Sequence, residues 1–171
     1  AYSPNGKTGL RPDRATIPYT AMARQAFPKV PVVLGGIEAS LRRLVHYDYW
    51  QDKIRGSILL DAKADLLVHG MGEHQVIEIA KRLERGQDIK DCRDIPGTLY
   101  ALGAKDPFPD NVITLPSLEE CRKDKRAFAS ITVESYRQAN PHCGKVIAQK
   151  HGSRWIVQNP PAVPLTTKEL D

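Results

Sequence analysis

Two short apolar segments end in glycines, and each is followed by a glutamate at the start of a helix-like segment. The apolar segments are residues 31–34 and 64–69, and the candidate cofactor-binding residues after them are Gly35, Gly36, Glu38, Gly70, Gly72 and Glu73. Glycine lets the backbone turn sharply and approach a bound group, and free N–H groups at a helix start can hold an anion. The plainer alternative is that the glycines only make tight turns and that the helix dipole alone favours the glutamates.

A second candidate group combines aromatic rings with charged side chains shortly after the first glycine turn. Its members, which we predict to bind substrate, are Arg42, His46, Asp48, Tyr49 and Trp50. Such a group can line a pocket near the end of a strand. The alternative is that the rings cover the edge of the core with their polar tips in water. His69, at the end of the second apolar segment, is more typical of a packed histidine than of a ligand.

The elements needed to position both groups are those of an α/β domain. Residues 31–34 and 64–69 are typical of buried strands, and residues 38–45 and 73–83 are typical of the helices that follow them. Two successive strand–glycine–helix units indicate a parallel sheet. Because parallel strands end on one side of a sheet, both glycine turns are expected at the same edge, where they can face one cleft.

The remaining elements are predicted on both sides of these two units. A helix is expected to begin near Pro18, with Asp13 as a candidate cap before it. Gly86 is expected to end the second helix of the two units. After it we predict two strands of an antiparallel excursion, a long helix with a capping box, and a closing hairpin, at residues 95–102, 111–115, 118–139, 145–150 and 154–158.

Length and composition fit one globular domain with a tail. The 171 residues are 41% hydrophobic and 26% charged, with a formal net charge of +5 and a pI near 9.2. These fractions are near the globular average, and no apolar run approaches the roughly 20 residues of a membrane span. We therefore expect a soluble, cytoplasmic protein with no membrane partner. Residues 1–158 are assigned to the domain, and the proline-rich residues 159–171 to a linker.

Several strong catalytic motifs are absent from the sequence. It contains no phosphate-binding P-loop, HExxH zinc motif, GxSxG nucleophile elbow or GxGxxG dinucleotide fingerprint. The motif-based routes to a P-loop NTPase, a zinc protease, a serine hydrolase and a Rossmann dehydrogenase are therefore excluded. Cys92, Cys121 and Cys143 are too far apart for a metal clip, and their odd number argues against a disulfide framework. We predict no catalytic residue and no metal site in this chain.

Three long runs of the sequence are distinctive: PVVLGGIEASLRR at 31–43, HYDYW at 46–50 and ADLLVHGMGE at 64–73. Together they resemble the N-terminal region of the YgiQ family of radical S-adenosylmethionine (SAM) proteins. Shorter likenesses at 11–14 and 159–165 extend the resemblance over nearly the whole chain. It implies a cobalamin-binding-like (flavodoxin/Rossmann-like) α/β domain with a parallel sheet, an antiparallel β excursion and a long helix. The first strands of the sheet are expected further upstream.

The resemblance also implies a larger enzyme that binds a [4Fe-4S] cluster and S-adenosylmethionine. In it this chain is expected to be an accessory domain that shapes the active site or binds substrate. The cluster-binding C-x-x-x-C-x-x-C loop is absent from the chain, so no cofactor and no radical chemistry are predicted for this fragment alone. The cobalamin-binding D-x-H-x-x-G signature is absent too, and cobalamin is kept as an alternative ligand of the glycine turns. The expected partners are the radical SAM core of the same polypeptide and an unidentified small-molecule or RNA substrate.

Two other functions are kept as alternatives. Aromatic residues interleaved with Arg42, Arg43, Lys53 and Arg55, together with the basic pI, favour an RNA-binding module. The other alternative is a purely structural docking domain, which binds no small ligand and associates with the radical SAM core.

Overall fold

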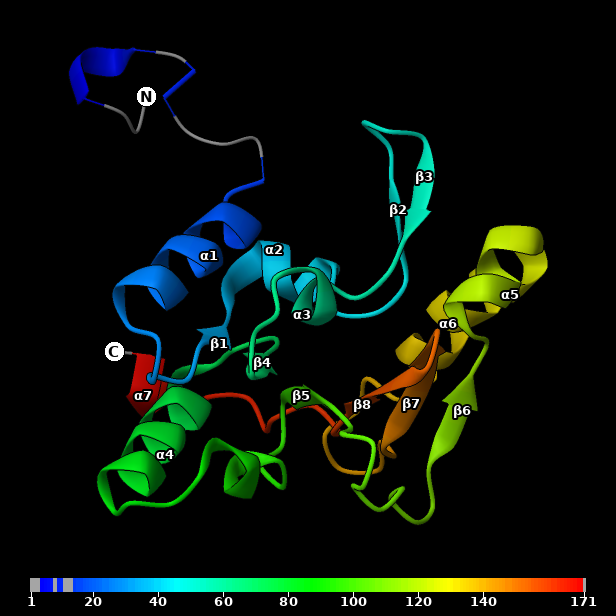
Figure 1. The fold of residues 1–171 in the computed structure, drawn as a ribbon. Helices are drawn as coiled ribbons and strands as arrows, with labels where there is room; N and C mark the ends of the chain where they lie inside the picture. The colour runs from blue at the N-terminus through cyan, green and yellow to red at the C-terminus, as the bar shows by residue number, and fades with distance from the viewer. Residues whose placement is uncertain (1–3, 8, 11–13, 171) are drawn as a thin grey trace.

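A six-stranded sheet forms the centre of the computed structural model, which describes residues 4–7, 9–10 and 14–170 (Figure 1). The strands lie in the order β1-β4-β5-β8-β7-β6. Their bounds are β1 Val33–Leu34, β4 Leu66–Val68, β5 Thr98–Ala101, β6 Ile113–Leu115, β7 Ile147–His151 and β8 Arg154–Gln158. The last strand in the chain, β8, therefore lies in the interior of the sheet. Strands β2 (His46–Asp48) and β3 (Lys53–Arg55) form a separate antiparallel hairpin.

The pairing of the strands confirms the α/β class and refines the expected sheet. Strands β1 and β4 are parallel, as the two strand–glycine–helix units predicted, and β6 pairs with β7 in parallel as well. The other three pairings, β4–β5, β5–β8 and β7–β8, are antiparallel. The sheet is thus mixed, with helices packed on it, and remains consistent with a flavodoxin- or Rossmann-like arrangement.

The predicted antiparallel excursion is corrected by the structure. Strands β5 and β6 correspond to the predicted strands at 95–102 and 111–115, but they do not pair with each other. Strand β5 lies between β4 and β8, and β6 lies at the far edge beside β7. The predicted hairpin of β7 and β8 is confirmed. It inserts between β5 and β6 because both of its strands are apolar enough to be buried.

Successive residues of the central strands pack into opposite cores. Leu67, Leu99 and Ile156 lie in one cluster, and their neighbours Leu66, Tyr100 and Val157 lie in the other. Side chains alternate between the faces of a sheet, so both faces are buried here. This double burial explains why the strands read as apolar runs without an alternating polar face.

Helices cover both faces of the sheet. Figure 1 shows α1, α2 and α3 on one side of it and α4 on the other. The helices are α1 Thr16–Ala26, α2 Gly36–Leu41, α3 Ile58–Asp61, α4 Glu73–Glu84, α5 Leu118–Lys123, α6 Lys125–Arg137 and α7 Thr167–Leu170, with 3₁₀ turns at Pro4–Gly6 and Ile89–Cys92. None of the helices in the described ranges is both long and apolar enough to cross a membrane.

Three helices match the sequence with small differences. Helix α1 begins at Thr16, so Pro18 falls in its first turn, where its missing N–H breaks no helical hydrogen bond. The candidate cap Asp13 lies outside the described residues. The predicted helix over 38–45 is wrong at its C-terminal end, because α2 ends at Leu41 and the chain turns toward β2. Helix α4 is confirmed, and Gly86 follows it with a φ of +82°.

The predicted long helix over 118–139 is divided in two. Helices α5 and α6 meet at Asp124, whose extended backbone (φ −131°, ψ 116°) interrupts the helix. The Asp124 carboxylate accepts a hydrogen bond from the backbone N–H of Arg126 at 2.8 Å and so caps α6. The predicted capping box of Ser117 and Glu120 is present at the start of α5.

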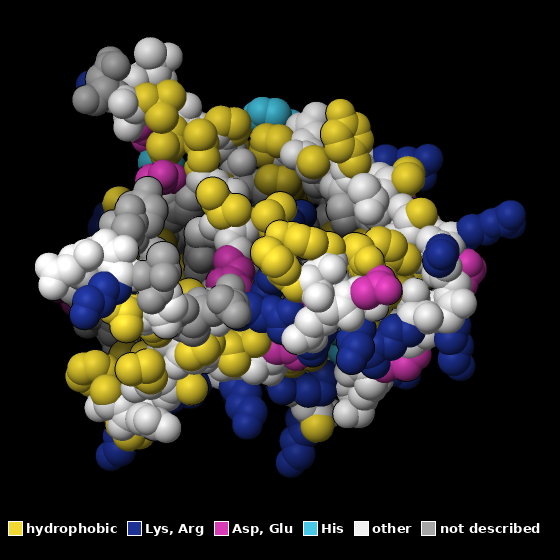
Figure 2. Space-filling view, turned by 90° about the horizontal axis from the view of Figure 1, so that it is seen from above, with side chains coloured by type: hydrophobic (Ala, Val, Ile, Leu, Met, Phe, Trp, Pro, Cys, Tyr) yellow, Lys and Arg dark blue, Asp and Glu magenta, His cyan; other side chains and the backbone are white. Residues whose placement is uncertain are grey.

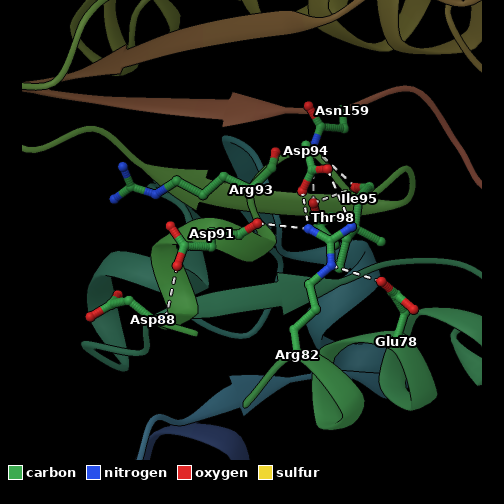
Figure 3. A network of polar contacts seen from close by, with 9 residues as sticks. All are labelled: Glu78, Arg82, Asp88, Asp91, Arg93, Asp94, Ile95, Thr98 and Asn159. Atoms are coloured by element: carbon green, nitrogen blue, oxygen red, sulfur yellow. Dashed lines mark hydrogen bonds and ion pairs between the residues drawn. The ribbon is translucent and has the colours of Figure 1, made fainter. Parts of the chain in front are cut away.

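An arginine network ties α4 to the segment before β5 (Figure 3). Arg82 donates to the Glu78 carboxylate at 2.8 Å, to the Asp94 carboxylate at 2.5 Å and to the Asp91 carbonyl at 2.7 Å. The hydrogen bonds that the guanidinium donates to the Asp94 and Glu78 carboxylates raise the pKa of Arg82. The 3₁₀ turn at Ile89–Cys92 is thereby held against the C-terminal half of α4.

Asn159 fixes the carboxyl end of β8 beside the start of β5 (Figure 3). Its buried side-chain amide donates to the Thr98 hydroxyl at 2.9 Å and to the Ile95 carbonyl at 3.0 Å. The next residue, Pro160, accepts a hydrogen bond from the Gly97 N–H at 2.7 Å. The beginning of the proline-rich segment is therefore packed onto the domain.

Candidate functional site

The four predicted glycines line one groove beside the edge strand β1. Gly35 and Gly36 follow β1, and Gly70 and Gly72 follow β4, which is the parallel neighbour of β1. The groove has a volume of about 360 Å³ and runs between these turns and α4. Its walls are apolar and comprise Val33, Leu34, Val68, Val76, Ile79, Ala80 and Leu83. The structure thus brings the glycines together at the carboxyl ends of two parallel strands, where α/β proteins bind ligands.

The glycines differ in what their backbone requires. Gly36 and Gly70 have φ values of +80° and +76°, a region that side-chain-bearing residues rarely adopt. A Cβ on Gly72 would lie 2.8 Å from Cγ1 of Val68, so this turn is closely packed. Gly35 is extended, and a Cβ there would meet no atom within 4 Å. Among the four glycines that line the groove, Gly35 is therefore the position that accepts a side chain without backbone strain or a close contact.

Glu38 and Glu73 lie outside the residues that line the groove. The Glu38 carboxylate accepts hydrogen bonds from the Thr16 backbone N–H at 3.2 Å and from the Thr16 hydroxyl at 2.6 Å. It also pairs with Arg42, one helical turn later, at 3.1 Å. Glu38 thus caps the start of α1 rather than facing a ligand. Glu73 is exposed in the first turn of α4 and makes no side-chain hydrogen bond or ion pair with the described residues.

The second predicted group is only partly brought together. Arg42, His46 and Asp48 line a small cavity of about 30 Å³ under α1. This volume holds a water molecule and excludes an organic ligand. Burial is the main cause that lowers the pKa of His46, which keeps the imidazole neutral at pH 7. Ile17 of α1 forms part of the lining of the same cavity.

Asp48 is the centre of an ion-pair network in this cavity. Its side chain is almost fully buried and pairs with Arg14 and, at 3.6 Å, with Arg55. Burial by itself raises the pKa of Asp48, but Arg14 and a hydrogen bond from the Gln51 N–H outweigh it and lower the pKa. The carboxylate therefore stays charged at neutral pH and joins the β2–β3 hairpin to the start of α1.

Tyr49 and Trp50 lie apart from this network, at the tip of the hairpin. Their rings stack with centroids 4.9 Å apart, and the residues are 68% and 75% exposed. On α2, Ile37 and Leu41 are 80% and 71% exposed. Figure 2 looks down on the side that carries α1, α2 and the hairpin, and it shows hydrophobic side chains gathered across this face. Scattered exposed apolar residues are normal, whereas a gathering of them is typical of an interaction surface.

Sequence reasoning missed a polar group at the carboxyl ends of β4 and β8. Arg43 donates to the Gln158 side chain at 2.8 Å, and His69 is buried near the guanidinium. The signal that could have found His69 is its place directly after a buried strand, beside the glycine turn. No local signal connects Arg43 with Gln158, because the two residues are far apart in the sequence.

The cysteines form no metal site within the described part of the chain. Cys92 and Cys121 are buried, Cys143 is exposed, and no group of three or more potential ligands comes together there. Burial is the main cause that raises the pKa of Cys121 to about 11, so its thiol is not a nucleophile at neutral pH.

Comparison with known proteins gives the family of the chain. A family model described as Radical SAM N-terminal matches residues 1–171. A UPF0313 protein from Geobacter sulfurreducens is 50% identical over 171 residues, which cover 100% of this chain and 28% of that protein. UPF0313 proteins from Rhodopseudomonas palustris and Clostridium perfringens are 46% and 47% identical, covering 100% and 99% of this chain and 28% and 26% of theirs.

The chain thus spans between a quarter and a third of the length of these relatives. No solved structure matches it. The resemblance to YgiQ-like proteins is confirmed, because UPF0313 proteins are that family of radical SAM proteins. With a family model that matches from the first residue to the last, the chain belongs to the Radical SAM N-terminal family.

Proposed function

We propose that this chain is the accessory domain of a longer radical SAM enzyme, and that its glycine groove contributes to the substrate-binding region of that enzyme. The observation that carries the proposal is the convergence of Gly35, Gly36, Gly70 and Gly72 on one apolar groove. Among the residues that the structure describes, no charged side chain lines the groove, so it suits an apolar part of a ligand approached by glycine backbone. Cobalamin remains an alternative occupant.

The radical chemistry of such an enzyme belongs outside this chain. The family implies a [4Fe-4S] cluster and S-adenosylmethionine for the longer protein. The residues described here do not fit the cluster, because two of the three cysteines are buried and none belongs to a metal-ligand group. What the domain itself contributes is a rigid apolar surface, held by α4 and by two parallel strands.

The test fills the groove without disturbing the fold. In the full-length protein, reconstituted with iron and sulfide, Gly35→Leu places a side chain in the groove from an extended, open position. The matched control is Ala129→Leu, which adds the same side chain to the exposed surface of α6. We expect Gly35→Leu to lower reductive cleavage of S-adenosylmethionine at least tenfold, or about 1.4 kcal/mol in activation free energy, and the control to leave it unchanged.

Equal cleavage of S-adenosylmethionine by both variants, with equal thermal unfolding midpoints, would contradict the proposal that the groove contributes to the substrate-binding region. Deleting residues 1–158 separates the remaining roles. Cleavage that depends on this region supports an active-site role, and cleavage that survives its removal supports recruitment or docking.

The docking alternative is favoured by the exposed apolar face of α2. If α2 docks on the rest of the polypeptide, replacing both Ile37 and Leu41 by Ser should weaken the association of this domain with the rest of the polypeptide. Limited proteolysis of the full-length protein should then cleave at the end of this domain several times faster than in the wild type. Val133→Ser, on the exposed side of α6, is the control. Unchanged proteolysis would contradict docking through α2.

The RNA-binding alternative finds less support in the contacts of its arginines. Arg42 pairs with Glu38, Arg55 pairs with Asp48, and Arg43 binds Gln158. Of the four basic residues, only Lys53 is exposed and makes no side-chain hydrogen bond or ion pair with the described residues. Binding to single-stranded RNA that falls steeply with added salt would revive this alternative.

A further inference from the structure

Arg43 is a half-buried cation that makes no ion pair with residues 4–7, 9–10 or 14–170. Its Nε donates to Oε1 of Gln158 at 2.8 Å, and Nη1 donates to the carbonyl oxygen of Ser40. Both acceptors are neutral. Burial lowers the pKa of Arg43, which is the signature of a charge taken out of water without compensation. Buried guanidinium groups are normally paired with a carboxylate or another anion.

His69 supplies a second unsatisfied group near Arg43. The residue is 7% exposed, and its Nε2 is buried without a hydrogen-bond partner. Burial first, and then the charge of Arg43, lower the pKa of His69 to about 4, while a backbone hydrogen bond at Asn159 acts in the opposite direction. The imidazole is therefore neutral at pH 7. Buried polar atoms are rarely left unpaired, so this nitrogen calls for an explanation.

Both groups lie at the edge of the sheet where ligands bind in α/β proteins. His69 follows β4, and Gln158 ends β8. These strands run in the same direction, because each is antiparallel to β5. The edge is held in place by the Ser40 hydroxyl, which accepts from the Gly70 N–H at 3.3 Å, and by the Asn159 contacts described above. Arg43 and His69 are thus fixed by the surrounding structure before any ligand arrives.

We infer that Arg43 and His69 form a binding site for the oxyanion of a small ligand, a phosphate or a carboxylate. The free N–H groups of the Arg43 guanidinium are donors suited to such an anion. His69 then contacts the anion through Nε2, as the acceptor for a protonated oxygen or, once it has taken up a proton, as a donor. The anion site is formed by this domain alone, so it can exist even if the proposed function of the glycine groove is wrong.

The first test measures binding of two probes, inorganic phosphate and acetate, by titration calorimetry of the full-length protein. Arg43→Gln should weaken binding of the preferred probe at least tenfold, and Arg43→Lys should retain part of it. Arg126→Gln is the matched control, since it removes an exposed arginine from the surface of α6. The preferred probe tells whether the site suits a phosphate or a carboxylate.

The second test reads the pKa of His69 by NMR, with His69→Gln used to assign its signal. An anion that neutralises Arg43 must raise the pKa of His69 from about 4, and Arg43→Gln should raise it without any anion. A merely structural Arg43 would not make the pKa of His69 respond to phosphate or acetate. This readout also survives if Arg43→Gln is unstable, because it uses the wild-type protein.

Three results would overturn the inference. The first is that neither phosphate nor acetate binds, and the second is that Arg43→Gln and Arg126→Gln lose binding equally. The third is that the pKa of His69 does not change when either anion is added. The absence of probe binding would mean that another part of the polypeptide supplies the counter-charge. Since Gly35→Leu tests the groove and Arg43→Gln tests the anion site, failure of one leaves the other interpretable.

Discussion

At the scale of single residues, the predicted ligand contact Glu38 makes hydrogen bonds within the domain. Glu38 follows a glycine turn, as a ligand-binding residue would, but its carboxylate binds Thr16 at the start of α1. This contact joins residues that are distant in the sequence, so no local pattern announces it. Conversely, the sequence does not show that Arg43 lacks a carboxylate partner. The fold shows it, because the side chain that accepts from Arg43 is the neutral amide of Gln158.

Replacing Glu38 by Ala should lower the free energy of unfolding by about 1–2 kcal/mol, because α1 loses the acceptor for its first N–H group. Glu73→Ala is the control, since Glu73 is also a first-turn glutamate but makes no side-chain hydrogen bond or ion pair with the described residues; its effect should be below about 0.5 kcal/mol. Urea unfolding at pH 7 measures both. Equal effects would mean that the contact of Glu38 with Thr16 does not stabilise the domain.

The lowered pKa of His69 predicts how stability depends on pH. Below about pH 6.5 the unfolded chain protonates this histidine, whereas the folded domain does so only near pH 4. Because the unfolded state binds more protons in this window, the free energy of unfolding falls as the pH drops from about 6.5 to 4.

At roughly 1.4 kcal/mol per pH unit, His69 accounts for up to about 3 kcal/mol of this fall. Chemical denaturation at several pH values across this window gives the free energy of unfolding as a function of pH. This free energy should depend less steeply on pH for His69→Gln than for the wild type, while His142→Gln, at an exposed site, should leave the slope unchanged. His151, whose pKa burial also lowers to about 4, should keep part of the slope in both variants. A His69→Gln curve parallel to the wild type would contradict the assignment.

At the scale of elements, most local signals agree with the structure, whereas the predicted pairing of β5 with β6 does not. The glycine turns after β1 and β4, the helix α4 and the capping box at Ser117 depend on neighbours in the sequence. The pairing of β5 depends on which strand distant in the sequence fills its open edge. That strand is β8, which lies near the end of the domain and is buried when it pairs with β5. The groove was predictable in outline because parallel strands must bring their following turns together.

The break between α5 and α6 gives a prediction at this scale. Asp124→Ala removes the side chain that caps α6 and should lower the free energy of unfolding by about 1 kcal/mol. Asp110→Ala, an exposed aspartate in the loop before β6, should cost less than about 0.5 kcal/mol. Chemical denaturation compares the two. If α5 and α6 fused into one helix in Asp124→Ala, the variant would instead be as stable as the control.

At the scale of the whole molecule, the sheet is two halves joined by one strand. Strand β8 pairs with β5 on one side and with β7 on the other, so it connects β1-β4-β5 to β7-β6. Its residues Ile156 and Val157 also contribute to the two opposite cores. Neither half can bury its inner edge without it.

Truncation after residue 152, which removes β8, should therefore abolish cooperative unfolding and near-UV circular dichroism. Truncation after residue 165 removes α7, which is tied to the domain by the ion pair of Glu169 with His74 at 3.0 Å, and should leave both signals intact. A cooperative transition in the shorter variant would show that the two halves fold without their shared strand.

The interior position of β8 also has a consequence for the order of events during protein synthesis. Domains usually fold as units while the ribosome is still extending the chain. Here the strand that closes the sheet is translated after the other five, so the earlier strands wait with unpaired edges until residue 158 has emerged. The free edge of β5 is therefore exposed to mispairing from the synthesis of residue 101 until residue 158 has emerged, and a chaperone that shields strand edges would act on the nascent domain in that interval.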